Sequence, residues 1–248
     1  MTVGIILAAG SGRRLKIHKP KGLLNIGGKP LIEYSIANLK AAGIYRIYVV
    51  TGFESEAYTN YFQNHYNGGA HITLIHNPEW AACGSLYSLY IALQEVESTA
   101  DVVILDSDIL YNCNEFLDFM QRPERNSILA TNVPEGRHDA CYLQTDLGDH
   151  LVKVSKNLNV IPHKDGDILW EYIGITQSSS DTLSQLKKYS KEKFESTGSI
   201  DHEYDYAFES IDAKYKIVRY RDYIWSEADD NEQLHYMITN TYPKISLY

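Results

Sequence analysis

The sequence predicts an α/β protein whose central sheet is doubly wound and mostly parallel. Two observations support this prediction. Four short apolar runs have the length of buried strands, and they lie at 3–8, 46–51, 71–76 and 101–106. Three longer segments between them have the length of helices, and they lie at 30–42, 54–66 and 84–96. Because strands that alternate with helices form a parallel sheet covered on both faces, the first half of the chain should be doubly wound.

From about residue 126 the pattern changes to shorter strands joined by turns that contain Gly and Asp. We expect these strands at 127–133, 140–145, 151–155, 170–176 and 215–219. Helices should cover 180–196, 203–210 and 231–240. The chain has 248 residues, 44% of them hydrophobic, which is enough for one well-buried domain. We therefore expect a single domain over residues 1–248, with a doubly wound half (1–125) and a mixed-sheet half (126–248).

The composition excludes several classes of function. A net charge of −9 and a pI near 5.4 argue against a general nucleic-acid or anionic-membrane surface. No stretch approaches the roughly 18 apolar residues of a membrane span, and the chain enters its first strand directly, so we expect a cytoplasmic protein. Cys83, Cys113 and Cys141 are widely spaced, which indicates neither a disulfide framework nor a zinc site.

The loop after the first expected strand consists of small residues. It runs through Leu7, Ala8, Ala9, Gly10, Ser11 and Gly12, and Arg14 and Lys21 follow it. Without bulky side chains, backbone N–H groups can approach a polyphosphate, and Arg14 and Lys21 add positive charge beside it. The spacing matches neither a Walker loop nor a dinucleotide fingerprint. The sequence predicts a nucleotide site here; a glycine-rich turn without a ligand is the alternative.

About the first 55 residues resemble the pyrophosphorylase-type (MobA-like) nucleotidyltransferase superfamily. The loop, the run from Gly27 to Ile32 and the strand from Ile47 to Gly52 carry the resemblance. It implies a Rossmann-like nucleotidyltransferase fold, with Arg14 and Lys21 as catalytic residues. It also implies that residues 1–125 bind the nucleotide and that residues 126–248 bind the acceptor and supply metal ligands.

Two acidic pairs are candidates for a metal site. Asp106 and Asp108 end an apolar strand, where residues two apart face the same way, and carboxylates suit Mg²⁺. A polar strand end is the alternative. The run from Trp225 to Asp229 resembles the Trp-x-Glu-Ile-Asp pattern of the phosphocholine and aminoethylphosphonate cytidylyltransferase branch, with Ala228 at the Ile position. This resemblance implies that Mg²⁺ is held by Asp108, Glu227 and Asp229. Capping of the following helix by Asp229 or Asp230 is the alternative.

The resemblance also suggests how the nucleotide base is bound. The base would contact Leu7, Ala8 and Ala9 on one side and Gly84 and Ser85 on the other, with Asp106 in the nucleotide site. CTP is the preferred nucleotide, because the space suits a pyrimidine and because of the branch the chain resembles. A helix that simply starts at Gly84 and Ser85 is the alternative.

The aromatic residues suggest how an acceptor is bound. Among 20 tyrosines and three tryptophans, Tyr142, Trp170 and Tyr172 are expected to surround an ammonium group. Glu171 would point to the opposite, exposed face of its strand. The acidic run from Asp201 to Tyr206 could also meet a cationic head group, although a solvated helix start is the simpler interpretation.

Together these features predict a CTP-dependent cytidylyltransferase. It would transfer CMP to a small phosphate or phosphonate acceptor, similar to phosphocholine, and release pyrophosphate, with Mg²⁺ as cofactor. Such a reaction belongs to the synthesis of cell-surface polysaccharide or phospholipid precursors, and the family suggests a homodimer. The first alternative is a sugar-1-phosphate nucleotidylyltransferase that uses UTP or dTTP. The second is a non-catalytic nucleotide-sensing relative, which would not need the metal carboxylates.

Overall fold

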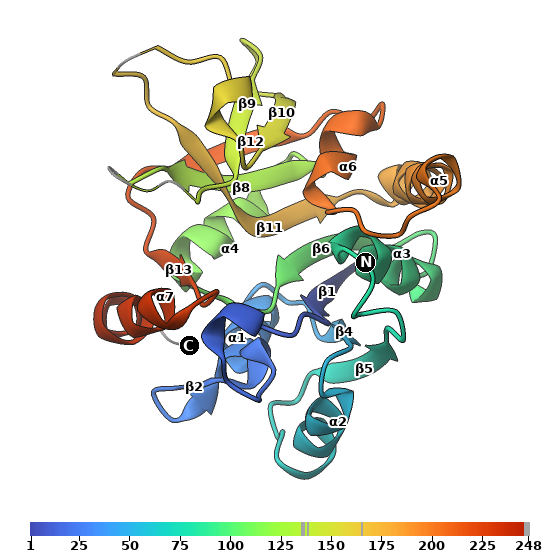
Figure 1. The fold of residues 1–248 in the computed structure, drawn as a ribbon, viewed down its shortest axis with the longest axis vertical. Helices are drawn as coiled ribbons and strands as arrows, with labels where there is room; N and C mark the ends of the chain where they lie inside the picture. The colour runs from blue at the N-terminus through green and yellow to red at the C-terminus, as the bar shows by residue number, and fades with distance from the viewer. Residues whose placement is uncertain (135–136, 138, 165, 246–248) are drawn as a thin grey trace.

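The structure is a computed structural model that describes residues 1–134, 137, 139–164 and 166–245. It has the α/β fold that the sequence predicts (Figure 1). In the first half the elements are β1 (Thr2–Ala8), β2 (Asn25–Ile26), β3 (Lys29–Pro30), α1 (Leu31–Ala41), β4 (Arg46–Thr51), α2 (Ser55–Asn64), β5 (His71–His76), α3 (Ser85–Glu95), β6 (Asp101–Asp106), β7 (Ile109–Tyr111) and α4 (Cys113–Gln121). The four expected strands and three expected helices of this half are confirmed.

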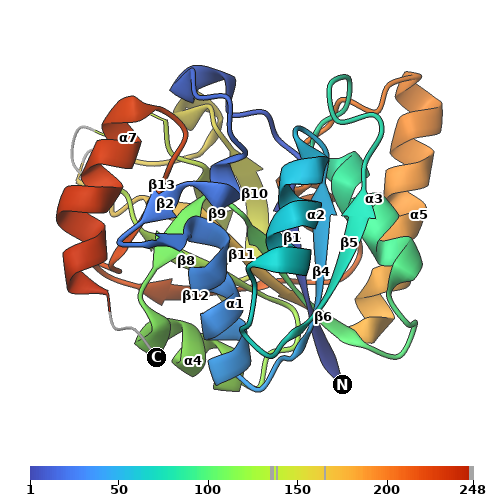
Figure 2. The same ribbon diagram turned by 90° about the horizontal axis from the view of Figure 1, so that it is seen from below.

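The first half forms a parallel sheet that is covered on both faces. β1 pairs in parallel with β4 and β6, and β4 pairs in parallel with β5. Successive residues of β1 point to opposite faces: Val3 and Ile5 pack in the core with α3 and α5 (Ser180–Thr197), whereas Ile6 packs in the core with α1, α2 and α4. Figure 2 shows these helices on the two sides of the sheet. The doubly wound prediction is therefore confirmed for this half.

The second half continues the same sheet with strands that pair mainly in antiparallel fashion. Its elements are β8 (Ser127–Asn132), β9 (Tyr142–Thr145), β10 (Leu151–Ser155), β11 (Trp170–Ser178), α5 (Ser180–Thr197), α6 (Asp205–Ser210), β12 (Lys216–Tyr220), β13 (Trp225–Glu227) and α7 (Asn231–Tyr236). Nine strands of the described chain form one sheet in the order β10-β9-β11-β6-β1-β4-β5, with β8 beside β11 and β12 beside β8. β11 is antiparallel to β6, β8 and β9. The mixed sheet expected for residues 126–248 is thus present.

Several elements differ from the sequence predictions. α4 and the short pairs β2–β3 and β7–β13 were not expected, although Phe116 and Phe119 of α4 have helical spacing and are fully buried. The helix expected over 203–210 begins only at Asp205. The last expected helix is α-helical only to Tyr236, after which Met237–Thr241 forms a π-helical turn.

The C-terminal segment packs against the N-terminal loop region. Leu15, Leu24 and Ile26 share one buried apolar cluster with Ala228 and Met237. In Figure 1 the blue N-terminal region and the red α7 lie beside each other. Because this cluster joins the two chain ends, it fixes the position of the acidic residues before α7 relative to the loop after β1.

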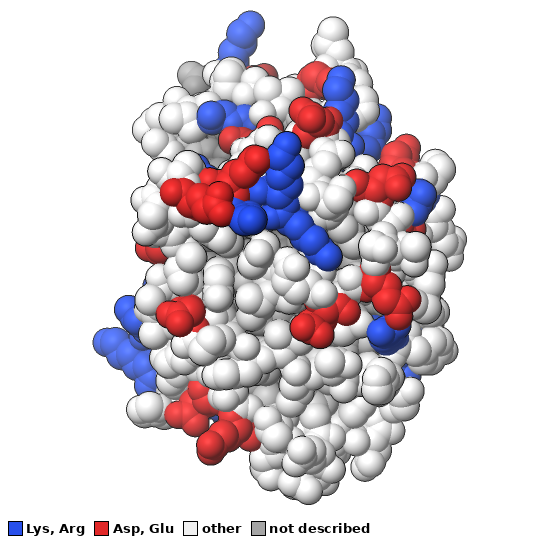
Figure 3. Space-filling view, turned by 90° about the vertical axis from the view of Figure 1, so that its right-hand side faces the viewer, with Lys and Arg blue, Asp and Glu red and all other residues white. Residues whose placement is uncertain are grey.

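The outer surface of α5 carries charges of both signs. Figure 3 shows the side of the molecule with α5, where Lys and acidic side chains lie next to one another. Two of these pairs are four residues apart on α5, Lys188 with Glu192 and Lys191 with Glu195, each at 3.8 Å. No helix in the described part of the chain is both long and apolar enough to cross a membrane.

Candidate functional site

A cavity of about 410 Å³ opens where β1 and β6 end, and we call it the central cavity. Of the residues singled out from the sequence, it is lined by Leu7, Ala9, Gly10, Gly12, Arg14, Lys21, Gly84, Ser85, Asp106, Asp108, Tyr172, Glu227 and Asp229. Ligands of open α/β sheets bind at this carboxyl end of the strands. The fold therefore gathers residues from both chain ends around one cavity.

Four of the expected residues do not line the central cavity. Ala8 points into the core on the opposite face of β1, and Ser11 lies between two lining residues without facing the cavity. Tyr142 packs in a small apolar cluster with Ala140 and Ile161. Trp170 packs against the core and has the Arg219 guanidinium 5.1 Å from its ring centroid. Tyr142 and Trp170 are therefore not part of the acceptor site that we propose.

Lys21 joins two of the candidate metal ligands. Its Nζ lies 2.8 Å from Asp108 Oδ2 and also donates to Asp229 Oδ1. Arg14 donates to the other oxygen of Asp229. Burial disfavours the charge on Lys21, but the two carboxylates outweigh it and raise the Lys21 pKa. For Asp229 burial is likewise outweighed by Lys21 and Arg14, which lower its pKa. The Lys21 ammonium and the Asp229 carboxylate are therefore both charged at neutral pH.

Asp229 and Asp230 are adjacent and have different roles. The Asp230 side chain accepts a hydrogen bond from Gln233 N at 2.9 Å and caps α7. Asp229 points instead to Lys21 and Arg14. Helix capping, left open by the sequence, is thus the role of Asp230, and the Asp229 side chain faces the central cavity.

Asp106 lies at the end of a buried chain of hydroxyl groups. Thr176 Oγ1 donates to Tyr172 OH at 2.9 Å, the Tyr172 and Tyr204 hydroxyls are 2.8 Å apart, and Tyr204 OH donates to Asp106 Oδ1 at 3.1 Å. Burial, with the nearby charge of Asp108, raises the Asp106 pKa. Tyr172 therefore contacts the site through its hydroxyl group.

Gly174 makes room for Asp106. It has a φ of +81° at the irregularity between Tyr172 and Thr176 in the β8–β11 pairing, and a Cβ there would lie 2.5 Å from Asp106 Oδ2. We predict that Gly174→Ala lowers the free energy of unfolding by at least about 2 kcal/mol, since it adds a clash to the backbone strain. Urea denaturation measures this loss.

Gly198→Ala is the matched control for Gly174→Ala. Gly198 also has a positive φ, +63°, but a Cβ there would meet nothing within 4 Å. Its substitution should cost only the backbone strain, about 1 kcal/mol. Equal losses in the two variants would show that the contact with Asp106 is not what requires glycine at position 174.

The start of α3 is held by the segment before α6. α3 begins at Ser85, as the alternative interpretation of Gly84 and Ser85 expected. Ser85 Oγ accepts from Tyr204 N at 3.0 Å and donates to Glu203, and a Cβ at Gly84 would lie 2.2 Å from the His202 carbonyl oxygen. This close backbone contact fixes one wall of the central cavity.

The far side of the central cavity contains residues that sequence reasoning missed. Lys156 lines it directly after β10, and Cys141 donates to Asp205 at 3.2 Å. Burial opposes the charge on Lys156, but Glu203 and Asp205 raise its pKa. Burial also raises the Asp205 pKa, an effect that Lys156 reduces. The sequence signal that could have identified Lys156 is its position directly after an expected strand. Asp108 was singled out because it also follows a strand.

Glu171 is buried, so the expectation that it is exposed was wrong. β11 is an interior strand, and Glu171 pairs there with Thr131 of β8 and Tyr142 of β9. Its side chain is 1% exposed and lies 3.0 Å from Arg137 Nη2. Burial raises the Glu171 pKa to about 8 despite the opposing charge of Arg137. The alternation of a strand predicted its face correctly, but that face is covered.

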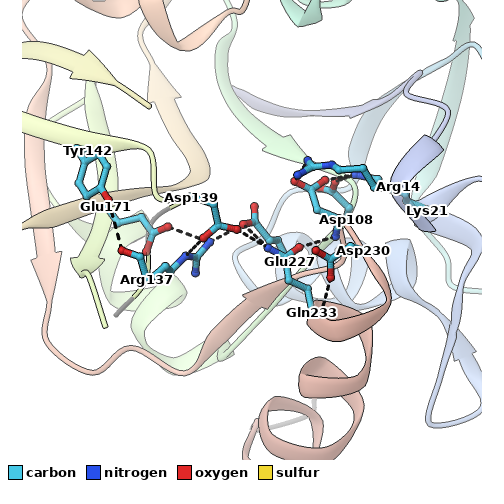
Figure 4. Close-up of polar contacts among 11 residues, drawn as sticks. Arg14, Lys21, Asp108, Arg137, Asp139, Tyr142, Glu171, Glu227, Asp230 and Gln233 are labelled. Atoms are coloured by element: carbon cyan, nitrogen blue, oxygen red, sulfur yellow. Dashed lines mark hydrogen bonds and ion pairs between the residues drawn. The ribbon is translucent and has the colours of Figure 1, made fainter. Parts of the chain in front are cut away.

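Glu227 connects this ion pair to the central cavity. Arg137 also binds Glu227, as Figure 4 shows. Burial, partly offset by Arg137, raises the Glu227 pKa to about 7. A second cavity, about 650 Å³, is lined by Arg137, Trp225 and Glu227, and we call it the side cavity. Glu227 lines both cavities.

The donor groups at this site fit Mg²⁺. Asp108 and Asp229 already converge on one cation, the Lys21 ammonium, and Glu227 lines the same cavity. Within the described ranges no three acidic, His or Cys side chains lie close enough together to hold a metal ion. Asp108 and Asp229 supply the one or two carboxylates that Mg²⁺ usually takes from a protein, and water and phosphate oxygens fill its remaining positions.

Sequence comparison identifies the family to which this protein belongs. Residues 4–165, more than half of the chain, match the sequence model of the MobA-like NTP transferase domain. The chain belongs to the MobA-like NTP transferase family. The central cavity of this family member is built from the matched region together with residues that lie beyond it, among them Tyr172, Asp205, Glu227 and Asp229.

Two curated relatives of this MobA-like protein are cytidylyltransferases. The choline-phosphate cytidylyltransferase of Streptococcus pneumoniae is 35% identical over 121 residues, 48% of this chain and 49% of that protein. The match therefore spans about half the length of that relative. The 2-aminoethylphosphonate cytidylyltransferase of Lancefieldella rimae is 26% identical over 200 residues, 79% of this chain and 75% of that protein.

A solved structure shares the fold. The CTP:phosphocholine cytidylyltransferase of Streptococcus pneumoniae superimposes with a TM-score of 0.74 at 22% identity, over 95% of this chain and 97% of that one. This agreement covers both the parallel half and the mixed half of the sheet.

Proposed function

We propose that this protein transfers CMP from CTP to a small phosphate or phosphonate acceptor and releases pyrophosphate. The observation that supports this most strongly is the convergence of Lys21 with Asp108 and Asp229 beside the Gly10 to Gly12 loop. This arrangement offers fixed positive charge and metal-binding oxygens at one point. The choice of CTP is supported by the cytidylyltransferase relatives.

The chain's own groups bind and orient the nucleotide. The loop backbone and Arg14 would hold the β- and γ-phosphates, since Arg14 lies at the cavity edge with its guanidinium toward the site. Lys21 would contact the α-phosphate. Asp108, Glu227 and Asp229 would hold Mg²⁺, which when bound neutralises charge on the phosphates.

The reaction needs no general base. An acceptor phosphate oxygen attacks the α-phosphorus, the bond from this phosphorus to the bridging oxygen breaks, and pyrophosphate leaves with that electron pair. A phosphate or phosphonate is already an anion at neutral pH, so no proton has to be removed from it. The protein's contribution is therefore position and electrostatic stabilisation by Lys21 and Arg14.

The far side of the central cavity supports an acceptor with both a phosphate and a cationic group. Lys156 would bind the acceptor phosphate, because it is a cation that lines the cavity. Asp205 is only 6% exposed and would face an ammonium group, with Tyr172 on the same wall. A sugar 1-phosphate has no cationic group to place beside this buried acidic side chain.

Pyrophosphate release tests the proposal. CTP, UTP, dTTP, ATP and GTP would each be incubated with Mg²⁺ and one acceptor from a panel: phosphocholine, phosphoethanolamine, aminoethylphosphonate, glycerol phosphate, phosphorylated amino acids and sugar 1-phosphates. We expect release with CTP and an acceptor that carries an ammonium group. Release with UTP or dTTP and a sugar 1-phosphate would replace this function by a sugar-nucleotide synthesis, and release with no pair would contradict a catalytic role.

A further inference from the structure

An ion-pair chain outside the central cavity ends on one of its carboxylates. Glu171 contacts Arg137, and Arg137 contacts Glu227 and, at 3.1 Å, Asp139 Oδ1. Figure 4 shows these residues in a row that runs from Tyr142 to Lys21 and Arg14. None of the functional steps described above uses Arg137 or Glu171.

The burial of the Glu171 side chain is unfavourable in free energy. Its side chain is 1% exposed, and among the described residues its Oε2 has no hydrogen-bond partner. A buried carboxylate without its cation costs several kcal/mol. Glu171 nevertheless lies in an interior strand, which fixes the position of its side chain. Because Arg137 contacts this side chain, Glu171 holds the guanidinium group at a defined position.

Arg137 is fixed on more than one side. Its guanidinium carbon lies 5.2 Å from the Trp225 ring centroid, its Nε donates to Asp139, and its Nη2, which contacts Glu171, also donates to Glu227. A planar fork can bridge several carboxylates while it covers an aromatic face, whereas a lysine ammonium cannot. Gln233 Nε2 adds a second donor to the same Glu227 oxygen, Oε1, at 3.4 Å.

We infer that Glu171 and Arg137 are positioning residues for the metal ligand Glu227. Buried Glu171 anchors Arg137, and Arg137, with Gln233, binds Oε1 of Glu227 and fixes the direction in which this carboxylate enters the central cavity. The inference rests on the proposed function, in which Glu227 holds the metal ion. Partners that orient a metal ligand from outside are typically worth about 10- to 100-fold in metal affinity or activity.

The test is Mn²⁺ binding, measured by electron paramagnetic resonance in the presence of CTP, together with kcat and KM for CTP. Arg137→Met should weaken Mn²⁺ binding at least about 10-fold and lower kcat more than it changes KM. Arg137→Lys, which keeps the charge but not the fork, should lose an intermediate amount. Mn²⁺ affinity within about twofold of the wild type in Arg137→Met would overturn the inference.

Arg219→Met is the matched control. The Arg219 guanidinium also lies over a tryptophan, 5.1 Å from the Trp170 centroid, and it binds Asp149 at 2.7 Å. The side chains of Arg137 and Arg219 are similarly covered, 20% and 25% exposed. Arg219→Met should leave Mn²⁺ affinity within about twofold of the wild type. An equal loss in both variants would show a general structural effect and overturn the inference.

The role of Glu171 is tested by a double-mutant cycle. Glu171→Gln alone should weaken Mn²⁺ binding, and in the Arg137→Met background it should cause no further loss, because both residues act through one contact. It should also raise the melting temperature of Arg137→Met, in which the Glu171 carboxyl group is buried without its partner. Additive losses would overturn the anchoring role. A wild type that binds Mn²⁺ but transfers no nucleotide would contradict the proposed function alone.

Discussion

Lys21→Ala should lower kcat at least about 10²-fold, the effect of removing one electrostatic donor from a site of this kind. Lys21 is 15% exposed, and its Nζ is the point at which Asp108 and Asp229 meet. On the proposed mechanism this variant removes the cation that contacts the α-phosphate, and the two carboxylates lose their shared partner. Steady-state kinetics with saturating CTP and Mg²⁺ measure the loss.

The fold of Lys21→Ala should remain intact, because Lys21 packs at the cavity wall and not in an apolar core. Circular dichroism and thermal unfolding check this. Lys19→Ala is the control in the same loop, since Lys19 is exposed and does not line the central cavity. It should retain wild-type kcat within about twofold. Near-normal turnover in Lys21→Ala would show that the role assigned to Lys21 is wrong.

The periodicity of the sequence predicted most of the fold. Val3, Ile5 and Ile6 alternate between two apolar faces, which is why β1 could be placed at the centre of a covered sheet. α4 was missed because its apolar stripe is short, and the β7–β13 pair because its strands have three residues each and come from distant parts of the chain.

The sequence also predicted many of the residues that line the candidate site, but it did not predict the contacts between them. A resemblance linked Asp108 with Glu227 and Asp229, although more than a hundred residues separate them in the chain. That Lys21 joins Asp108 and Asp229 depends on tertiary packing, namely the cluster in which Leu15 meets Met237. Nothing local could show this.

Glu171 shows why the burial of a side chain could not be predicted from the sequence. Alternation gives the face on which a side chain lies, but burial of that face depends on which strands become neighbours. Here β8 and β9 flank β11, and Arg137 reaches Glu171 from a separate segment. The same reason explains Trp170, whose neighbour Arg219 comes from β12.

Asp229→Asn should lower kcat at least about 10²-fold, an effect comparable to that of losing one electrostatic contact to the transition state. Asp229 accepts from both Arg14 and Lys21, and its two oxygens are the link between the loop cations and the candidate metal site. An amide keeps the shape but binds Mg²⁺ less strongly and no longer balances the two cations. The apparent Mg²⁺ requirement of the reaction should rise together with the loss of kcat.

Asp230→Asn is the sharpest control, because it makes the same chemical change one residue further along the chain. Asn is as good a helix cap as Asp, so the bond from Gln233 N should persist and α7 should keep its stability. We expect kcat within about twofold of the wild type, whereas Asp230→Ala should lose about 1 kcal/mol in the free energy of unfolding. If Asp229→Asn and Asp230→Asn reduced turnover equally, the acidic pair would act through the helix, and the assignment of Asp229 to the metal site would fail.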